Sequence, residues 1–172
     1  TSATQPDAFA FSPANLAAAK AFVTKYPDGY QASAVLPLLD LVQRQNDGWL
    51  PQAALSYVAD FLDMPPMRVY EVATFYTMLN LAPVGRHHVQ VCTNISCNLC
   101  GAQDVLEAFL EHTNTEMGAT SIDGGFTVIE AECLAGCGFA TCVQINSRYY
   151  ENVTTEEVPR IVAHLRDRDA GV

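Results

Sequence analysis

Positive charge is scarce in this sequence. Its 172 residues include only 9 Lys and Arg against 19 Asp and Glu, which gives a formal net charge of −10. Without a basic patch to release counterions, nucleic acid and anionic membrane surfaces are poor partners. No apolar run approaches the roughly 18 residues needed to span a bilayer. We therefore expect no membrane span, and no secretory leader within the chain.

Cysteine is missing from the first half of the chain. All six cysteines fall between Cys92 and Cys142. A disulfide framework would staple the whole chain, whereas a cluster in one segment indicates a metal or redox site in a reducing compartment. Because 49% of the residues are hydrophobic, the chain is able to bury a core, and a disordered protein is excluded.

Hydrophobic spacing over residues 1–85 predicts a compact helical bundle. Ser12 and Pro13 have the residue types of an N-cap and a first helical position. The segment 46–48 (Asn-Asp-Gly) and the pair Pro65-Pro66 interrupt the helical pattern. Helices are predicted from Pro13 onward and over residues 34–45, 51–62 and 67–79.

Residues 86–172 change to the pattern of a thioredoxin-like α/β domain. A strand over 87–92, a helix over 101–112 and a strand over 126–130 form a unit with parallel pairing. Two further strands, over 142–146 and 149–151, form an antiparallel hairpin. A last helix is predicted from Thr154, with Glu157 completing a capping box. The predicted fold class is α+β: a helical bundle followed by a domain with a four-stranded mixed sheet.

The cysteines are spaced as Cys92-x4-Cys97-x2-Cys100 and, after 32 residues, Cys133-x3-Cys137-x4-Cys142. Thiolates are the usual ligands of iron–sulfur clusters, four per cluster, and also bind structural zinc. Two adjacent parallel strands would bring both groups of cysteines to one end of the sheet. That geometry suits a binuclear cluster with one pair of sulfurs per iron. The acidic surroundings predict a low reduction potential.

The spacing alone leaves three other interpretations open. The plant-type ferredoxin spacing would use Cys100 as a ligand and leave two of the last three cysteines idle. A zinc-stapled interaction module is another possibility. The third is a thiol–disulfide oxidoreductase using Cys97 and Cys100 at a helix start. Against the third, no proline lies between Pro83 and Pro159 to face the dithiol.

Other conspicuous residues carry no cofactor prediction. His87 and His88 are adjacent in a strand and point to opposite faces, so we expect surface or interface positions rather than a shared metal. Trp49 and the pair Phe75-Tyr76 are expected in packing or at a partner surface. Gly136 and Gly138 lack the third glycine of a dinucleotide fingerprint, so NADH and flavin should not bind to this chain alone.

Several short segments spread over residues 11–166 together form a specific signature. They are 26–29 (YPDG), 34–41 (AVLPLLDL), 48–51 (GWLP), 66–78 (PMRVYEVATFYTM), 89–93 (VQVCT), 132–134 (ECL) and 143–146 (VQIN). With these segments the sequence resembles the 24 kDa [2Fe–2S] subunits of respiratory complex I (NADH:quinone oxidoreductase), a family of thioredoxin-like ferredoxins. The resemblance implies a helical bundle followed by a thioredoxin-like domain, which agrees with the pattern.

The resemblance implies that the ligands of one [2Fe–2S] cluster are Cys92, Cys97, Cys133 and Cys137, which argues against the plant-type choice. The sequence departs from the family at Cys100 and at the segment 140–142, where Cys142 adds another thiol near the site. Cys142, which leads into a strand, is expected to be a small core residue.

The resemblance also implies an electron-transfer subunit that exchanges one electron with a flavin, in which the helical bundle of residues 1–85 docks against the partner. FMN and NADH are then expected on a larger partner subunit, beside other subunits of the peripheral arm. The implied location is the cytoplasmic face of the bacterial inner membrane or the mitochondrial matrix side. Similar subunits serve NAD-linked hydrogenases and formate dehydrogenases, and one chain does not separate these parents from complex I.

Overall fold

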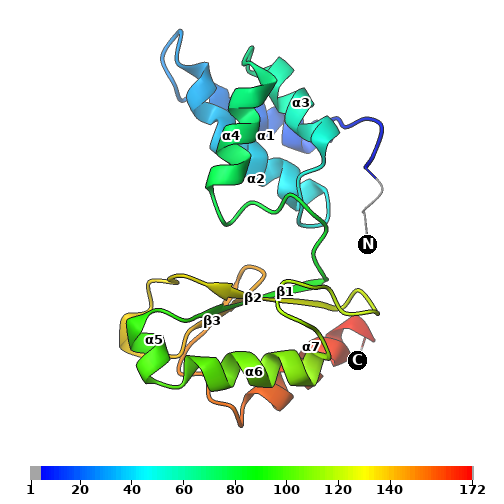
Figure 1. The fold of residues 1–172 in the computed structure, drawn as a ribbon. Helices are drawn as coiled ribbons and strands as arrows, with labels where there is room; N and C mark the ends of the chain where they lie inside the picture. The colour runs from blue at the N-terminus through cyan, green and yellow to red at the C-terminus, as the bar shows by residue number, and fades with distance from the viewer. Residues whose placement is uncertain (1–4, 172) are drawn as a thin grey trace. The chain divides into compact units, whose positions relative to one another are not determined.

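The computed structural model describes residues 5–171, which form two compact units. The first unit ends at Pro83 and the second begins at Val84. Each unit has its own hydrophobic core, one among helices and the other between a sheet and its helices. The expected fold class, a helical bundle followed by a thioredoxin-like domain with a four-stranded mixed sheet, is confirmed (Figure 1).

The first unit is a bundle of short helices around an apolar core. Ser12 caps the first helix as predicted, because its Oγ accepts a hydrogen bond from the Asn15 backbone N–H at 3.3 Å. Leu38, Leu39 and Val42 of the second helix are fully buried in the shared core. The elements are α1 (Pro13–Val23), a 3-10 turn η1 (Gln31–Ala34), α2 (Val35–Gln45), α3 (Gln52–Phe61) and α4 (Pro66–Phe75).

The helix predicted over 67–79 is too long at its C-terminal end. Tyr76, which follows α4, has an extended backbone with φ −91° and ψ 116°. The cause is a side chain distant in sequence. Gln43 on α2 donates from Nε2 to the Met78 carbonyl at 2.9 Å and accepts from the Asn80 N–H at 2.7 Å. These two bonds hold the segment in an extended path that helical spacing does not reveal.

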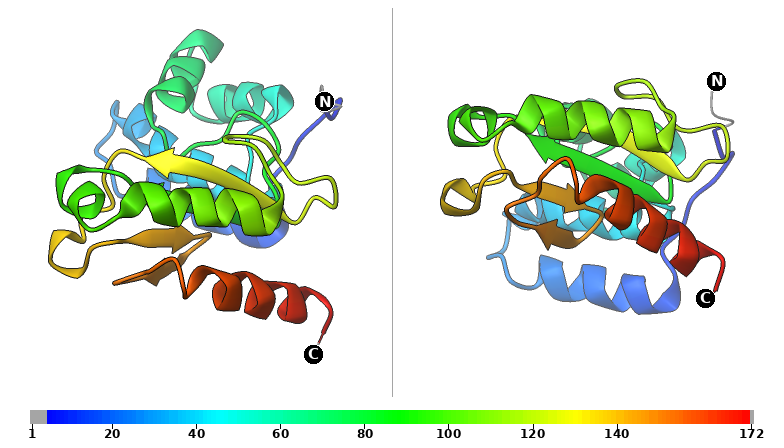
Figure 2. Two further views of the ribbon diagram at one scale, coloured as in Figure 1. Left: turned by 60° about the horizontal axis from the view of Figure 1, so that its bottom comes forward. Right: turned by 90° about the horizontal axis from the view of Figure 1, so that it is seen from below.

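The second unit is a four-stranded mixed sheet. The strand order is β2-β1-β3-β4. The parallel pairing of β1 with β2 and the antiparallel pairing of β3 with β4 are confirmed, and the structure adds an antiparallel pairing of β3 with β1. Figure 2 shows α6 and α7 on the same face of this sheet. The elements are β1 (His87–Cys92), α5 (Ile95–Leu99), α6 (Ala102–Thr113), β2 (Phe126–Ala131), a 3-10 turn η2 (Cys137–Phe139), β3 (Val143–Ile145), β4 (Arg148–Tyr150) and α7 (Val158–Asp169).

Alternation along β1 separates the core from the cysteine-rich end. Val89 and Val91 are fully buried and belong to the core that the sheet forms with α6 and α7. Cys92 follows Val91 and therefore points to the other face. There it joins a separate small cluster with Cys97 and Cys142. The same strand thus anchors the hydrophobic core and delivers a thiol to its end.

The last helix begins later than Thr154. The predicted capping bond forms in part, because Glu157 Oε2 accepts from the Thr154 N–H at 3.3 Å, but residues 155–157 are a turn and α7 starts at Val158. Pro159 explains the delay. It has no N–H and its ring is not accommodated in a helix interior, so the helix begins where Pro159 falls in the first turn.

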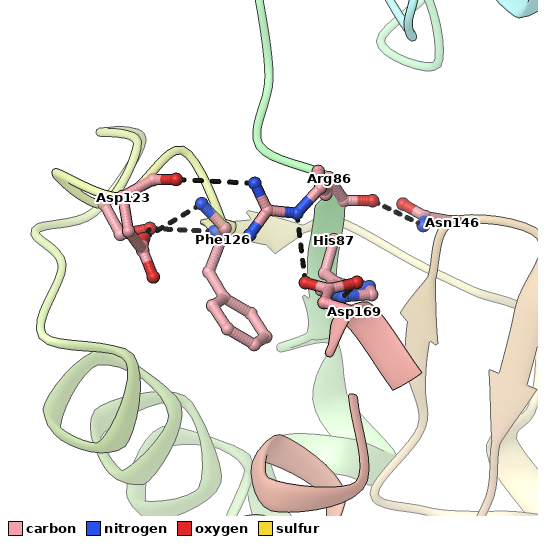
Figure 3. Close-up of polar contacts among 8 residues, drawn as sticks. Arg86, His87, Asp123, Phe126, Asn146 and Asp169 are labelled. Atoms are coloured by element: carbon pink, nitrogen blue, oxygen red, sulfur yellow. Dashed lines mark hydrogen bonds and ion pairs between the residues drawn. The ribbon is translucent and has the colours of Figure 1, made fainter. Parts of the chain in front are cut away.

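The two histidines of β1 are buried, which corrects the expectation of a surface position. His87 Nε2 lies 3.0 Å from Asp169 Oδ1, and Arg86 Nε donates to Asp169 Oδ2 at 3.0 Å (Figure 3). The His87 ring also packs against Phe126, with centroids 5.1 Å apart. These contacts tie the end of α7 to the start of β1. Burial lowers the pKa of His88 below its ordinary value.

We predict that Gln43→Ala lowers the free energy of unfolding of the helical unit by about 1–3 kcal/mol, because two hydrogen bonds to the segment after α4 are lost. Urea unfolding followed by circular dichroism measures the change. Gln52→Ala, at an exposed position of α3, is the matched control and should change stability by less than about 0.5 kcal/mol. Equal effects of the two substitutions would contradict the role given to Gln43.

A pH dependence is predicted from His88. Because its pKa is lowered in the folded protein, the unfolded chain binds a proton at higher pH than the native protein does. The contribution of neutral His88 to the free energy of unfolding is therefore complete above about pH 6.5 and declines as the pH falls below that value. His88→Gln should flatten the slope of unfolding free energy against pH in this window, whereas the exposed control His112→Gln should leave it unchanged. An unaltered slope in His88→Gln would show the idea to be wrong.

Candidate metal centre

Two cysteine-bearing loops leave the sheet at the same end. β1 and β2 run parallel, and their last residues, Cys92 and Ala131, are register partners. The loop over residues 93–101 follows β1, and the loop over residues 132–142 follows β2. Figure 2 shows α5 and the turn after β2 at this end of the sheet. The register therefore brings the C-x4-C and C-x3-C segments to one place.

Asn94 ties the two loops together. Its Oδ1 accepts from the Ile95 N–H at 2.8 Å and caps α5, while its Nδ2 donates to the Glu132 carbonyl at 2.8 Å. Beside it, Thr93 Oγ1 donates to the Glu130 carboxylate. Sequence reasoning missed Asn94. Its place before a short helix signals an N-cap, but the bond across 38 residues leaves no pattern in the sequence.

The second loop makes close contacts with itself. Ala135 has a φ of 58°, a left-handed conformation that is uncommon for a residue with a Cβ, and its N–H donates to Cys133 Sγ at 3.3 Å. In η2, the Phe139 N–H donates to the Gly136 carbonyl at 2.8 Å. The side chains of Cys133 and Cys137 are exposed. The loop thus leaves both of these cysteines accessible to solvent.

The sulfur of Cys92 lies where the two loops meet. Burial favours a higher pKa for this thiol. The backbone N–H groups of Asn94 and Leu134 and the neighbouring thiols of Cys97 and Cys133 outweigh burial, so the pKa of Cys92 is lowered. A lowered pKa favours the thiolate, which is the form that binds metals.

Cys97 shows the opposite tendency. Its side chain is only 3% exposed. Burial is the main cause that raises the pKa of Cys97 to about 11. A backbone hydrogen bond from Cys142 opposes it, and the neighbouring Cys92 thiol adds to the rise. A cation bound beside Cys97 would supply the compensating charge, since a coordinating thiol is deprotonated by its metal.

The two loops carry two pairs of thiols. Cys92, Cys97 and Cys133 are neighbours, and Cys137 is exposed on η2 of the loop that carries Cys133. A [2Fe–2S] cluster divides four cysteines between two irons and therefore requires two pairs of thiols. Two loops with one pair each match that donor set.

Cys97 and Cys100 lack the arrangement of a reactive dithiol. The attacking thiol of such enzymes is partly exposed and has a lowered pKa. Here Cys97 is buried with a raised pKa, and Cys100 is exposed at the end of α5. The Cys100 carbonyl accepts a hydrogen bond from Thr141 Oγ1 at 3.3 Å. This geometry argues against a thiol–disulfide oxidoreductase.

Cys142 is completely buried, as expected of a small core residue. Sequence reasoning did not place it in contact with the site. It nevertheless lies in one cluster with Cys92 and Cys97, and its carbonyl accepts from the Cys92 N–H at 3.0 Å. Cys142 was expected near the site from the sequence, but its spacing does not reveal these contacts.

Comparison with known proteins gives matches over most of the chain. The profile of the thioredoxin-like [2Fe–2S] ferredoxin family matches residues 19–166. The E subunit of NADH-quinone oxidoreductase from Rickettsia bellii is 49% identical over 159 residues, which are 92% of this chain and 95% of that protein. The corresponding protein of Rickettsia felis is 47% identical over 154 residues, or 90% and 92% of the two chains.

Solved structures add a likeness in fold. An NAD⁺-reducing [NiFe]-hydrogenase in the air-oxidised state superposes with a TM-score of 0.65 over 76% of this chain, at 16% sequence identity. The match spans only 23% of that chain, so it speaks for the fold alone. The family implies an iron–sulfur cluster, with which the two pairs of thiols agree. The profile match and the identity to the two Rickettsia proteins together show that the chain belongs to the thioredoxin-like [2Fe–2S] ferredoxin family.

Proposed function

We propose that this chain is the electron-transfer subunit of the NADH dehydrogenase module of complex I, with one [2Fe–2S] cluster held by Cys92, Cys97, Cys133 and Cys137. The observation that carries the proposal is the parallel register of β1 and β2, which places two cysteine pairs at one end of the sheet. The similarity over almost the whole length of the two Rickettsia proteins supports the parent complex.

Backbone N–H groups prepare the ligand sulfurs for negative charge. The N–H groups of Asn94 and Leu134 lower the pKa of Cys92, and the Ala135 N–H donates to Cys133 Sγ. Such donors stabilise thiolates in both the oxidised and the reduced protein. A bound [2Fe–2S] cluster supplies reversible uptake of one electron. The role of the chain is to hold these sulfurs in place and to set the potential at which the electron is taken up.

The charge around the site favours a low reduction potential. No Lys or Arg lies between Arg86 and Arg148, a segment that includes both loops. Glu130 and Glu132 stand exposed where β2 passes into the second loop. An added electron increases the negative charge of a site whose own loops carry no cation, so reduction is disfavoured.

An apolar rim around the cysteines suits a partner subunit. Ile95 and Leu99 of α5 are 75% and 84% exposed, and Phe139 of η2 is 53% exposed. These elements also carry Cys97 and Cys137. Large apolar side chains gathered beside a redox site mark an interface. We assign this face to the larger subunit that holds FMN and NADH, with which the cluster exchanges one electron.

The helical unit offers a second surface for assembly. Met67, Tyr70, Phe75 and Met78 are large, exposed and close together in sequence along α4 and beyond. Met67 and Tyr70 also line a cavity of ≈ 470 Å³. We assign residues 1–85 to docking against subunits of the peripheral arm.

The proposed location is the peripheral arm of a membrane complex, on the cytoplasmic or matrix side. Among the helices of residues 5–171, none has the length and apolar character needed to cross a membrane. The family resemblance gives the equivalent subunit of an NAD-linked hydrogenase or formate dehydrogenase as the second candidate, and the fold likeness to the hydrogenase is compatible with it. Identification of the subunits that co-purify with the chain separates these parents, and the long match to the Rickettsia proteins favours complex I.

The ligand assignment predicts how single cysteine variants behave. Cys133→Ala and Cys137→Ala should lose nearly all iron-dependent visible absorption and circular dichroism, because each removes one of four cluster ligands. Cys100→Ala is the matched control and should keep both signals. A cluster that survives in Cys137→Ala and is lost in Cys100→Ala would contradict the assignment and favour the plant-type ligand set.

A further inference from the structure

The Cys142 thiol is hydrogen-bonded to the loop that carries Cys133 and Cys137. Its buried Sγ lies 3.1 Å from the Gly136 carbonyl oxygen and 3.2 Å from the Phe139 carbonyl oxygen, and donates its hydrogen toward both. These two carbonyls stand on either side of Cys137 in sequence. The Cys142 carbonyl in turn accepts from the Cys92 N–H at 3.0 Å. One residue therefore links the end of β1 to the second loop.

Tyr149 of β4 is also hydrogen-bonded to this loop. Its hydroxyl donates to the Leu134 carbonyl, the residue directly after Cys133. Burial, together with the nearby Cys142 thiol, raises the pKa of Tyr149, so the hydroxyl keeps the hydrogen that it donates. The hydrogen bonds of Cys142 and Tyr149 thus reach the loop at three carbonyls between Cys133 and β3.

Gly136 shows how closely the loop is packed on these two side chains. A Cβ at this position would lie 2.5 Å from Cys142 Sγ and 2.6 Å from Tyr149 Oη. A Cβ atom cannot approach other atoms this closely. Cys142 and Tyr149 therefore require glycine at position 136. Gly138, two residues on, provides a contrast, because a Cβ there meets nothing within 4 Å.

We propose that Cys142 and Tyr149 are positioning residues that hold the second loop in the conformation in which Cys133 and Cys137 take up iron. The inference rests on the proposed function for the identity of the ligands. Cys142 itself is not a ligand in this arrangement, since a thiolate that binds iron has no hydrogen to donate to two carbonyl oxygens. A preorganised loop loses less conformational freedom when the cluster binds, and therefore retains the cluster longer.

The first test compares how fast a chelator removes iron from anaerobically purified full-length variants. Loss of an outer hydrogen-bonding partner typically weakens metal binding about 10- to 100-fold. We expect Cys142→Ala and Tyr149→Phe to lose iron about tenfold faster than the parent chain. Cys142→Ser keeps a donor of similar size and should stay within about twofold of the parent. Tyr150→Phe, on the neighbouring residue, should have no effect.

A second readout does not depend on the cluster. The Phe139 N–H donates to the Gly136 carbonyl, and the Asn152 N–H donates to the Phe139 carbonyl, so both amides report on the order of the loop. Hydrogen exchange at these amides should be about five- to tenfold faster in Cys142→Ala than in the parent chain, and close to the parent value in Cys142→Ser. Gly136→Ala should also speed this exchange, whereas Gly138→Ala should not.

Two outcomes would overturn the inference. One is a Cys142→Ala protein with parental iron loss and parental exchange at Phe139 and Asn152. The other is a Cys142→Ser protein that loses iron as fast as Cys142→Ala, which would make the sulfur itself a ligand. If the parent chain holds no cluster, the proposed function fails. The exchange rates then still decide whether Cys142 and Tyr149 order the loop.

Discussion

The parallel register between β1 and β2 is the constraint on which the rest of the site depends. Pairing Cys92 with Ala131 brings together two loops that are far apart in sequence. A slip of one residue would turn Cys92 toward the core face and Val91 toward the loops. The buried Val89, Val91 and Val128 prevent that slip, because they fill the core beneath α6 and α7. The hydrophobic packing of the sheet and the placement of the thiol are therefore one requirement.

On this frame, hydrogen bonds rather than apolar burial give the loops their shape. Asn94 joins the first loop to the second, and Cys142 and Tyr149 hold the second loop to the sheet. The exposed thiols of Cys133 and Cys137 contribute little packing of their own. The arrangement suits a centre whose ligands must remain accessible to iron and sulfide while their backbone stays ordered.

Regular elements could be predicted from the sequence because their causes are local. The alternating pattern of residues 87–92 predicts β1, and Ser12 predicts the start of α1 as its N-cap. The errors arose where distant residues intervene. Gln43 ends α4 early through bonds across 35 and 37 residues, and the buried environment of His87 is completed by Asp169, 82 residues away. Pro159 is an exception, because its effect on the start of α7 is local and was underestimated.

The location of the candidate site could be predicted from the sequence, but the residues that hold its loops in place could not. Cysteine spacing and parallel pairing bring the C-x4-C and C-x3-C groups to one end of the sheet, and the family resemblance then selects four of the six thiols as proposed ligands. Asn94 and Tyr149 belong to residue types that occur in any loop or strand. Their bonds to backbone carbonyls become visible only when the fold brings the second loop against them.

The central claim is that this chain holds a binuclear iron–sulfur cluster. The most direct measurement is iron and acid-labile sulfide per chain, on protein purified without oxygen. The account predicts about two of each. Zinc without sulfide, or protein without metal in which Cys97 and Cys100 form a reducible disulfide, would contradict it.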